Sequence, residues 1–106
     1  MPRPPHTSRQ AAMLFATLLD QPDRWWHGYA LMQETGLRSG SLYPLLIRLA
    51  DDSFLEDRWD LAGEQSRPRR EYRLTASGRA LASERLARFA ARAGLTEPKP
   101  DMGQVQ

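Results

Sequence analysis

Cysteine is absent from the 106-residue sequence, which removes disulfide bonds, thiolate metal sites and cysteine nucleophiles together. Histidine is scarce: His6 and His27 do not have the spacing of a metal site, so we assign His27 to packing. No segment approaches the roughly 20 apolar residues of a membrane span, and the polar N-terminal segment lacks the apolar core of a secretory signal. We therefore expect a cytoplasmic protein that binds no membrane, metal or cofactor.

Catalytic patterns are missing as well. The sequence contains the residues of a Ser-His-Asp catalytic triad, namely Ser41, His27 and Asp51. Nothing in it resembles a nucleophile elbow or an oxyanion hole, however, which such a triad would require. We therefore predict that the protein is not an enzyme. The composition, with 41% hydrophobic and 26% charged residues, is typical of one globular domain, and the net charge is only +2. The placement of the charges must therefore identify the partner.

Apolar residues recur at helical spacing in three segments of the first half. A first helix is predicted to begin after Ser8, a typical N-cap residue, and to end before Pro22. A short second helix is predicted to end at Gly36. The third helix, residues 39–52, has an i, i+3, i+4, i+7 repeat of leucines, namely Leu42, Leu45, Leu46 and Leu49.

Pro44 limits where the third helix can start, because proline fits best in the first turn. We therefore expect Ser41 as the N-cap, with Ser39 as the second choice.

Short segments with bulky alternating residues follow at 54–59 and 71–74. The segment between them, residues 60–70, is rich in glycine, serine, proline and charge, which predicts a two-stranded hairpin with an exposed tip. A last helix is predicted to begin after Thr75. Its apolar residues have the spacing of a coiled-coil seam, which predicts a dimer interface made by Ala82, Leu86, Phe89 and Ala93.

The order helix, helix, turn, helix, hairpin, helix predicts a mainly α fold, a winged helix-turn-helix followed by a C-terminal dimerisation helix. We expect a flexible arm at residues 1–7, a DNA-binding domain at 8–74, the dimerisation helix at 75–94 and a flexible tail at 95–106.

A helix that enters the major groove exposes small polar residues and hydrogen-bond donors near its N-terminus. The predicted contacts of helix 39–52 are Ser39, Gly40, Ser41, Tyr43, Pro44 and Arg48. The wing segment 67–73 carries four arginines and one glutamate, and three of these arginines are predicted to bind backbone phosphates or a minor groove: Arg67, Arg69 and Arg70. The alternatives are a solvated hairpin without a specific partner and, for Tyr43, a packing role in the core.

Three blocks of this sequence resemble PadR-like transcriptional regulators: HGYALMQ (27–33), SGSLYPLLIRLADD (39–52) and RPRREYRLTASGR (67–79). The resemblance extends over roughly residues 11–92 and implies a homodimeric repressor whose C-terminal helix packs across a two-fold axis. Ser53-Phe54 departs from the usual glycine and aliphatic residue of the family, and Trp25-Trp26 stands where smaller residues are usual. Adjacent residues of an extended segment point to opposite sides, so we expect one tryptophan of the pair in the core.

We therefore predict a sequence-specific DNA-binding regulator that acts as a homodimer on a pseudo-palindromic operator, with two copies of helix 39–52 about 34 Å apart. A small-molecule effector is unidentified, and the last helix offers only Phe89 for an aromatic pocket. The alternative function is a winged-helix protein–protein interaction module without specific DNA binding, and a third is a ligand-sensing dimer that also binds DNA.

Overall fold

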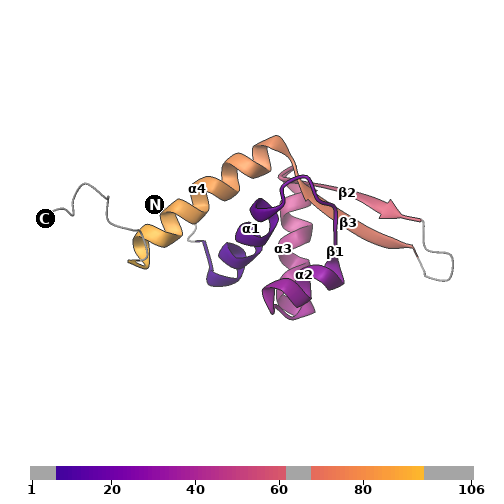
Figure 1. Ribbon diagram of the computed structural model, residues 1–106, viewed down its shortest axis with the longest axis horizontal. Helices are drawn as coiled ribbons and strands as arrows, with labels where there is room; N and C mark the ends of the chain where they lie inside the picture. The colour runs from indigo at the N-terminus through magenta and orange to yellow at the C-terminus, as the bar shows by residue number, and fades with distance from the viewer. Residues whose placement is uncertain (1–6, 62–67, 95–106) are drawn as a thin grey trace, which may run out of the picture.

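The computed structural model describes residues 7–61 and 68–94. Its elements are α1 (Arg9–Asp20), β1 (Trp26–His27), α2 (Gly28–Thr35), α3 (Ser39–Asp51), β2 (Leu55–Asp60), β3 (Arg69–Leu74) and α4 (Ala76–Arg92). Helices α1, α2 and α3 form a central bundle, from which the sheet extends to one side and α4 to the other (Figure 1). The mainly α winged-helix fold predicted from the sequence is confirmed. Within the two described ranges, no helix combines the length and the hydrophobicity of a membrane span.

Local capping signals fix most helix ends as predicted. The Ser8 side chain accepts a hydrogen bond from the backbone N–H of Ala11 at 3.0 Å, and Thr75 accepts one from Gly78 at 3.0 Å. Gly36 ends α2 in the left-handed conformation, with φ 77°. Because these signals involve only neighbouring residues, they can be identified in the sequence.

The predicted cap of α3 is wrong. Arg38 is the N-cap, and its side chain makes no capping hydrogen bond. The backbone N–H of Leu42 already donates to the carbonyl of Arg38 at 2.9 Å, so Ser39 and Ser41 lie inside the first turn. Pro44 consequently lies in the second turn, on the exposed side of the helix, where it lacks the N–H that would donate to the residue four positions earlier.

In the part of the chain that the structure describes, the sheet has three strands, not the two that the sequence predicts. The strand order is β1-β3-β2, and both pairings are antiparallel. The added strand β1 pairs Trp26 with Tyr72 and His27 with Glu71. Strands β2 and β3 also extend further than expected, because β2 ends at Asp60 and β3 begins at Arg69. Residues at both ends of the predicted tip 60–70 are therefore strand residues, and 62–67 lie outside the described chain.

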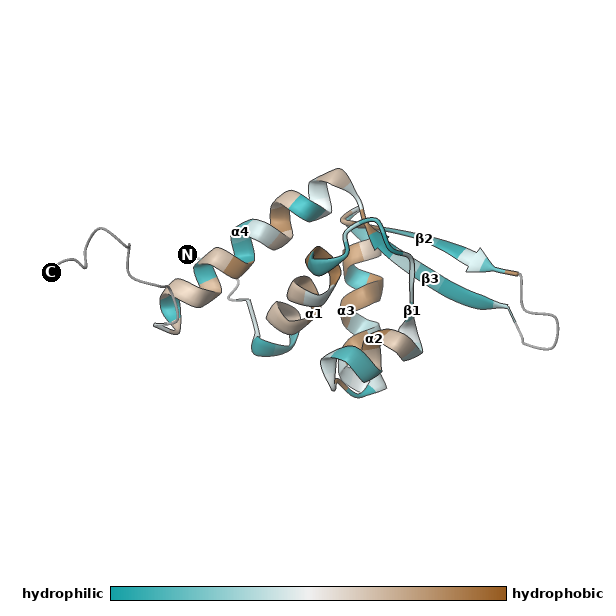
Figure 2. Ribbon diagram, viewed as in Figure 1, coloured by the Kyte–Doolittle hydropathy of each residue, from teal (hydrophilic) through white to brown (hydrophobic). Residues whose placement is uncertain are grey.

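The core lies between α1, α2, α3 and the start of the sheet. Its largest fully buried side chains are leucines of α1, α2, α3 and β3, namely Leu14, Leu18, Leu31, Leu42, Leu46 and Leu74. Figure 2 shows the apolar residues concentrated on the helices, whereas β2 and β3 are largely hydrophilic. The core therefore belongs to the helices, and the outer part of the wing contributes little to it.

The two adjacent tryptophans lie on opposite sides of the sheet, as predicted. Trp26 is buried in the core, at 2% exposure. Trp25 lies on the other face, with the guanidinium groups of Arg58 and Arg73 at 4.0 and 4.4 Å from its ring centre. This arrangement stabilises the sheet surface by cation–π contacts.

The folded unit begins earlier than predicted. Thr7 is buried, so it belongs to the folded unit and not to the predicted arm 1–7; residues 1–6 and the predicted tail 95–106 lie outside the described chain. Ser53 has φ 67°, which is the left-handed region that favours glycine. This conformation explains why a glycine would suit position 53, where the sequence departs from the resemblance.

Gly78 should be intolerant of any side chain, because a Cβ there would collide with the backbone carbonyl oxygen of Phe54. We expect Gly78→Ala to lower the free energy of unfolding by about 1–3 kcal/mol, although alanine is the better helix former. Urea denaturation would measure the change. Gly40→Ala is the matched control: a Cβ at Gly40 meets nothing within 4 Å, so the free energy should rise by up to about 1 kcal/mol. An equal effect at both positions would contradict the packing argument.

Candidate nucleic-acid interface

Helix α3 has one buried and one exposed face. Leu42 and Leu46 are completely buried, and Leu49 is nearly so. Residues 39–41, at the N-terminal tip, are exposed, and so are Pro44 and Ile47 on the side opposite to the leucines. The helix is therefore held from behind by leucines while its polar tip faces outward, as the sequence predicts.

The turn between α2 and α3 is held by the side chain of Thr35. Its hydroxyl donates to the carbonyl of Leu31 at 2.7 Å and accepts from the backbone N–H of Leu37 at 3.1 Å. Thr35 is buried, so its bond to Leu31 is shielded from water, and the bond from Leu37 is partly shielded. Together with Gly36 they fix the direction in which the chain enters α3, and hence the position of the exposed tip.

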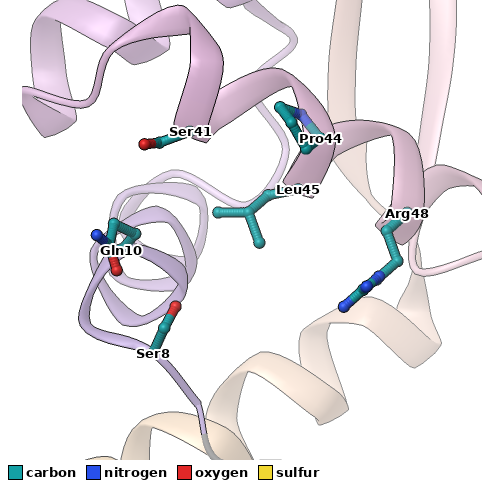
Figure 3. Close-up of a pocket in the computed structure, with 6 residues that line it drawn as sticks. All are labelled: Ser8, Gln10, Ser41, Pro44, Leu45 and Arg48. Carbon is teal, nitrogen blue, oxygen red and sulfur yellow. The ribbon is translucent and has the colours of Figure 1, made fainter.

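A shallow hollow lies beside the exposed face of α3. Figure 3 shows Ser41 and Arg48 projecting from α3 on one side, with Ser8 and Gln10 of the α1 end on the other. The hollow has a volume of about 300 Å³. Arg48 is exposed, and its side chain makes no hydrogen bond or ion pair with another described residue. Its guanidinium group is therefore available to an anion from outside the chain.

The side chain of Tyr43 is partly packed against the protein and partly exposed. Its ring and hydroxyl lie directly over Gly28, where a side chain would collide with them, and the residue is 36% exposed. It also lies near Tyr72 and Arg70 of the wing. Burial raises the pKa of the Tyr72 hydroxyl, and Tyr43 raises it further while Arg70 opposes the rise. Tyr43 thus connects α3 with the start of α2 and with the wing, and its contact with phosphate stays a prediction.

The wing arginines differ in how far they are already neutralised. Arg70 lies over the ring of Trp59 at 4.5 Å and pairs with Asp57 at 3.5 Å. Arg69 is exposed, and within the described ranges its side chain makes no ion pair or hydrogen bond. Arg67 lies outside the described residues. Of the described arginines predicted for the wing, Arg69 is therefore the free cation.

Sequence reasoning missed three exposed residues on or beside this surface. Arg38 lies at the N-terminus of α3 and has no ion pair with another described residue. Ile47 and Trp59 are large apolar residues that are 59% and 55% exposed. The turn position of Arg38 was a usable signal, because a cation next to a helix tip that binds phosphate is favourable. The exposure of Ile47 follows from its place opposite Leu42 on the helix.

The predicted dimer seam on α4 needs one correction. Ala82 is completely buried inside its own chain, where α4 packs on the core, so it has no surface to offer a partner. The later seam residues line an open apolar groove of about 590 Å³ together with residues of α1. The residues that line it are Leu86, Phe89 and Ala93 of the seam region with Arg9, Ala12, Met13 and Ala16.

His27 is not simply a packing residue. Its Nε2 atom lies 2.9 Å from Oδ2 of Asp60 and 3.6 Å from Oε2 of Glu71. The spacing of the two histidines in the sequence does not indicate this cluster. The partners of His27 are carboxylates from other strands, which only the folding of the sheet brings together.

Comparisons with known proteins agree with this geometry. The model of the transcriptional regulator PadR-like family matches residues 17–84. The structure is similar to a PadR-like transcription factor from Bacteroides fragilis (25% identity, TM-score 0.63, 81% of this chain and 87% of that chain). It is also similar to a PadR family transcriptional regulator from Eggerthella lenta (29%, 0.63, 80% and 79%). The PcaV regulator from Streptomyces coelicolor, solved with its natural ligand, shares the fold (20%, 0.66, 84% and 59%). No curated protein sequence matches the chain.

Gly28→Ala should disturb the interface through Tyr43, because the new Cβ would occupy the place of the tyrosine hydroxyl and ring edge. We expect the free energy of unfolding to fall by about 1–3 kcal/mol in urea denaturation. In a Tyr43→Ala background the same change should have almost no cost, because the space is then empty. Equal losses in the two backgrounds would show that Tyr43 does not occupy the space beside Gly28.

Proposed function

The chain belongs to the PadR-like family of transcriptional regulators, and from this we propose that it is a homodimeric repressor of a pseudo-palindromic operator. The observation that carries the proposal is the outward tip of α3, held by buried Leu42 and Leu46 and accompanied by unpaired arginines. A helix of this kind fits the major groove, which is about 12 Å wide.

The exposed residues of α3 have the chemistry for reading bases. Ser39 and Ser41 carry hydroxyls that donate or accept, and Gly40 between them lets the backbone approach the DNA closely. Ile47, at 59% exposure, suits apolar contact with a thymine methyl group. The residues that contact bases are therefore those of the first two turns of α3 together with Ile47.

Phosphate contact falls to the unpaired arginines around this tip. Arg38 lies at the helix N-terminus, where the backbone N–H groups and the helix dipole also favour an anion. Arg48 lies on one flank of α3, and Arg69 lies on the wing near the other flank, beside Tyr43. Cations on both sides of a reading helix set its register on the duplex without reading sequence. The wing then lies on the backbone or in the minor groove.

The apolar groove between α1 and α4 forms the dimer interface in this proposal. Phe89 and Leu86 are half-buried in the single chain, and Met13 opposite them is 38% exposed. A second copy would cover this apolar surface, since its own α4 presents the same residues around a two-fold axis. Two reading helices about 34 Å apart would then enter successive major grooves, and the bound dimer would exclude RNA polymerase.

Arg69→Ala should weaken binding to all sequences alike, because the wing arginine contacts phosphate and no base. On an operator selected from a random DNA pool, the slope of log affinity against log salt should become shallower by about one unit. Arg79→Ala is the matched control: it removes the same charge from α4, where Arg79 pairs with Asp23 at 2.8 Å. If the selection recovers no sequence, or if affinity responds little to salt, the protein-interaction module becomes the better assignment.

Phe89→Glu should convert the dimer into a monomer, because a carboxylate would be buried in the apolar groove. Sedimentation velocity would measure the change in mass, with circular dichroism as the check that the chain stays folded. Ala87→Glu places the same charge on an exposed position of α4 and should leave the mass unchanged. A dimer that persists in Phe89→Glu would locate the interface elsewhere.

A further inference from the structure

Three polar side chains from three strands meet on one face of the sheet. His27 comes from β1, Asp60 from the end of β2 and Glu71 from β3. One ligand-type atom of each residue, the ring nitrogen or a carboxylate oxygen, lies within 4.8 Å of the other two. The closest pair is His27 Nε2 and Asp60 Oδ2 at 2.9 Å, and His27 Nε2 lies 3.6 Å from Glu71 Oε2.

The strand register explains why these residues meet. His27 is paired with Glu71 across β1 and β3, and Arg58 is paired with Glu71 across β2 and β3. Side chains alternate between the faces of a strand, so Asp60, two residues after Arg58, lies on the same face. The arrangement is thus fixed by backbone pairing rather than by mobile surface side chains.

Glu71 is a nearly buried carboxylate that is held in place by a neighbouring arginine. The residue is only 8% exposed. Its Oε1 atom accepts a hydrogen bond from Arg58 Nε at 2.7 Å. Within the described ranges, no hydrogen bond to its Oε2 atom is present, and His27 Nε2 lies 3.6 Å from that oxygen. Oε2 lies on the side of the carboxylate that faces His27, where a cation would meet the ligand atoms of all three residues.

The donor set has the chemistry of a metal site. One imidazole nitrogen and two carboxylate oxygens suit zinc and similar divalent transition metals. Metal–ligand bonds of about 2.0–2.2 Å place tetrahedral ligands roughly 3.3 Å apart. The His27 and Asp60 atoms, 2.9 Å apart, would therefore separate slightly, and the wider pairs of the group, which lie within 4.8 Å, would draw together. The bond from Arg58 would orient Glu71 from outside, as ligating carboxylates usually require.

We propose that His27 Nε2, Asp60 Oδ2 and Glu71 Oε2 bind one divalent transition-metal cation of the zinc class, with water completing the coordination. The metal takes the lone pair of Nε2, so the proton on that nitrogen leaves and the imidazole keeps its proton on Nδ1. The two carboxylates balance the charge of the metal, and the guanidinium of Arg58 stays on the other oxygen of Glu71.

The site would join the wing to the helix-turn-helix. His27 directly precedes α2, whereas Asp60 and Glu71 belong to the two wing strands. A bound cation would therefore fix the angle between the wing and the reading helix, and this consequence rests on the proposed DNA-binding function. Metal binding itself does not rest on it.

The test uses the full chain without DNA. After treatment with a chelator, we expect calorimetry to show one zinc ion per chain, and cobalt(II) to give the visible absorption of a nitrogen- and oxygen-ligated ion. His27→Gln should weaken zinc binding at least about tenfold, since it removes a direct ligand. His6→Gln, which removes the other histidine of the sequence, should leave the affinity unchanged.

Thermal unfolding in the absence of metal would show whether each variant is folded. Zinc should raise the melting temperature of the wild type and not that of His27→Gln, because a ligand that binds the folded state stabilises it. Absence of stoichiometric binding, or binding that persists in His27→Gln, would overturn the site. Because no readout contains DNA, these results are independent of the operator experiments.

Discussion

The interface depends on one packing constraint, the burial of Leu42 and Leu46 on the inner side of α3. Each leucine that is removed from water contributes about 1.5–3 kcal/mol, which far exceeds the contribution of an exposed ion pair. This burial fixes the rotation of α3 about its own axis, and the exposed position of Ile47 follows from it. The hydrogen bonds of Thr35 then fix where the helix begins. Rotation and starting point together determine which side chains face outward.

The wing is organised by charge pairing rather than by a core. Across β2 and β3, Arg58 bonds to Glu71 at 2.7 Å and Arg73 to Glu56 at 3.1 Å. These contacts keep the two strands together beyond the last buried residues, and each contributes little on its own because most of the groups are exposed. Among the described wing residues, most of the positive charge is thus paired with carboxylates of the wing itself. The free charge of Arg69 is left to interact with a partner.

Much of the fold could be predicted from the sequence because its signals are local. The caps at Ser8 and Thr75 and the glycine at the end of α2 depend on residues within one turn. Strand β1 was missed because two residues carry no periodicity, and its pairing with Tyr72 is a long-range contact. The ion pair between Arg70 and Asp57 depends on the register of β2 against β3, and this register cannot be predicted from the composition of the segment. For Ala82, the spacing indicates an apolar face but cannot distinguish a partner in the same chain from one in a second copy.

Pro44 leaves one backbone carbonyl of α3 without its usual hydrogen-bond donor. Proline has no N–H, so the carbonyl of Gly40, four residues earlier, has no donor at the usual place in the helix. Both positions are exposed, and Gly40 has no side chain to cover its own backbone. The helix therefore presents a main-chain acceptor to the solvent at mid-surface. Water can satisfy this carbonyl in the free protein, and in the proposed DNA complex the exocyclic amino group of an adenine or cytosine would be a suitable donor to replace that water.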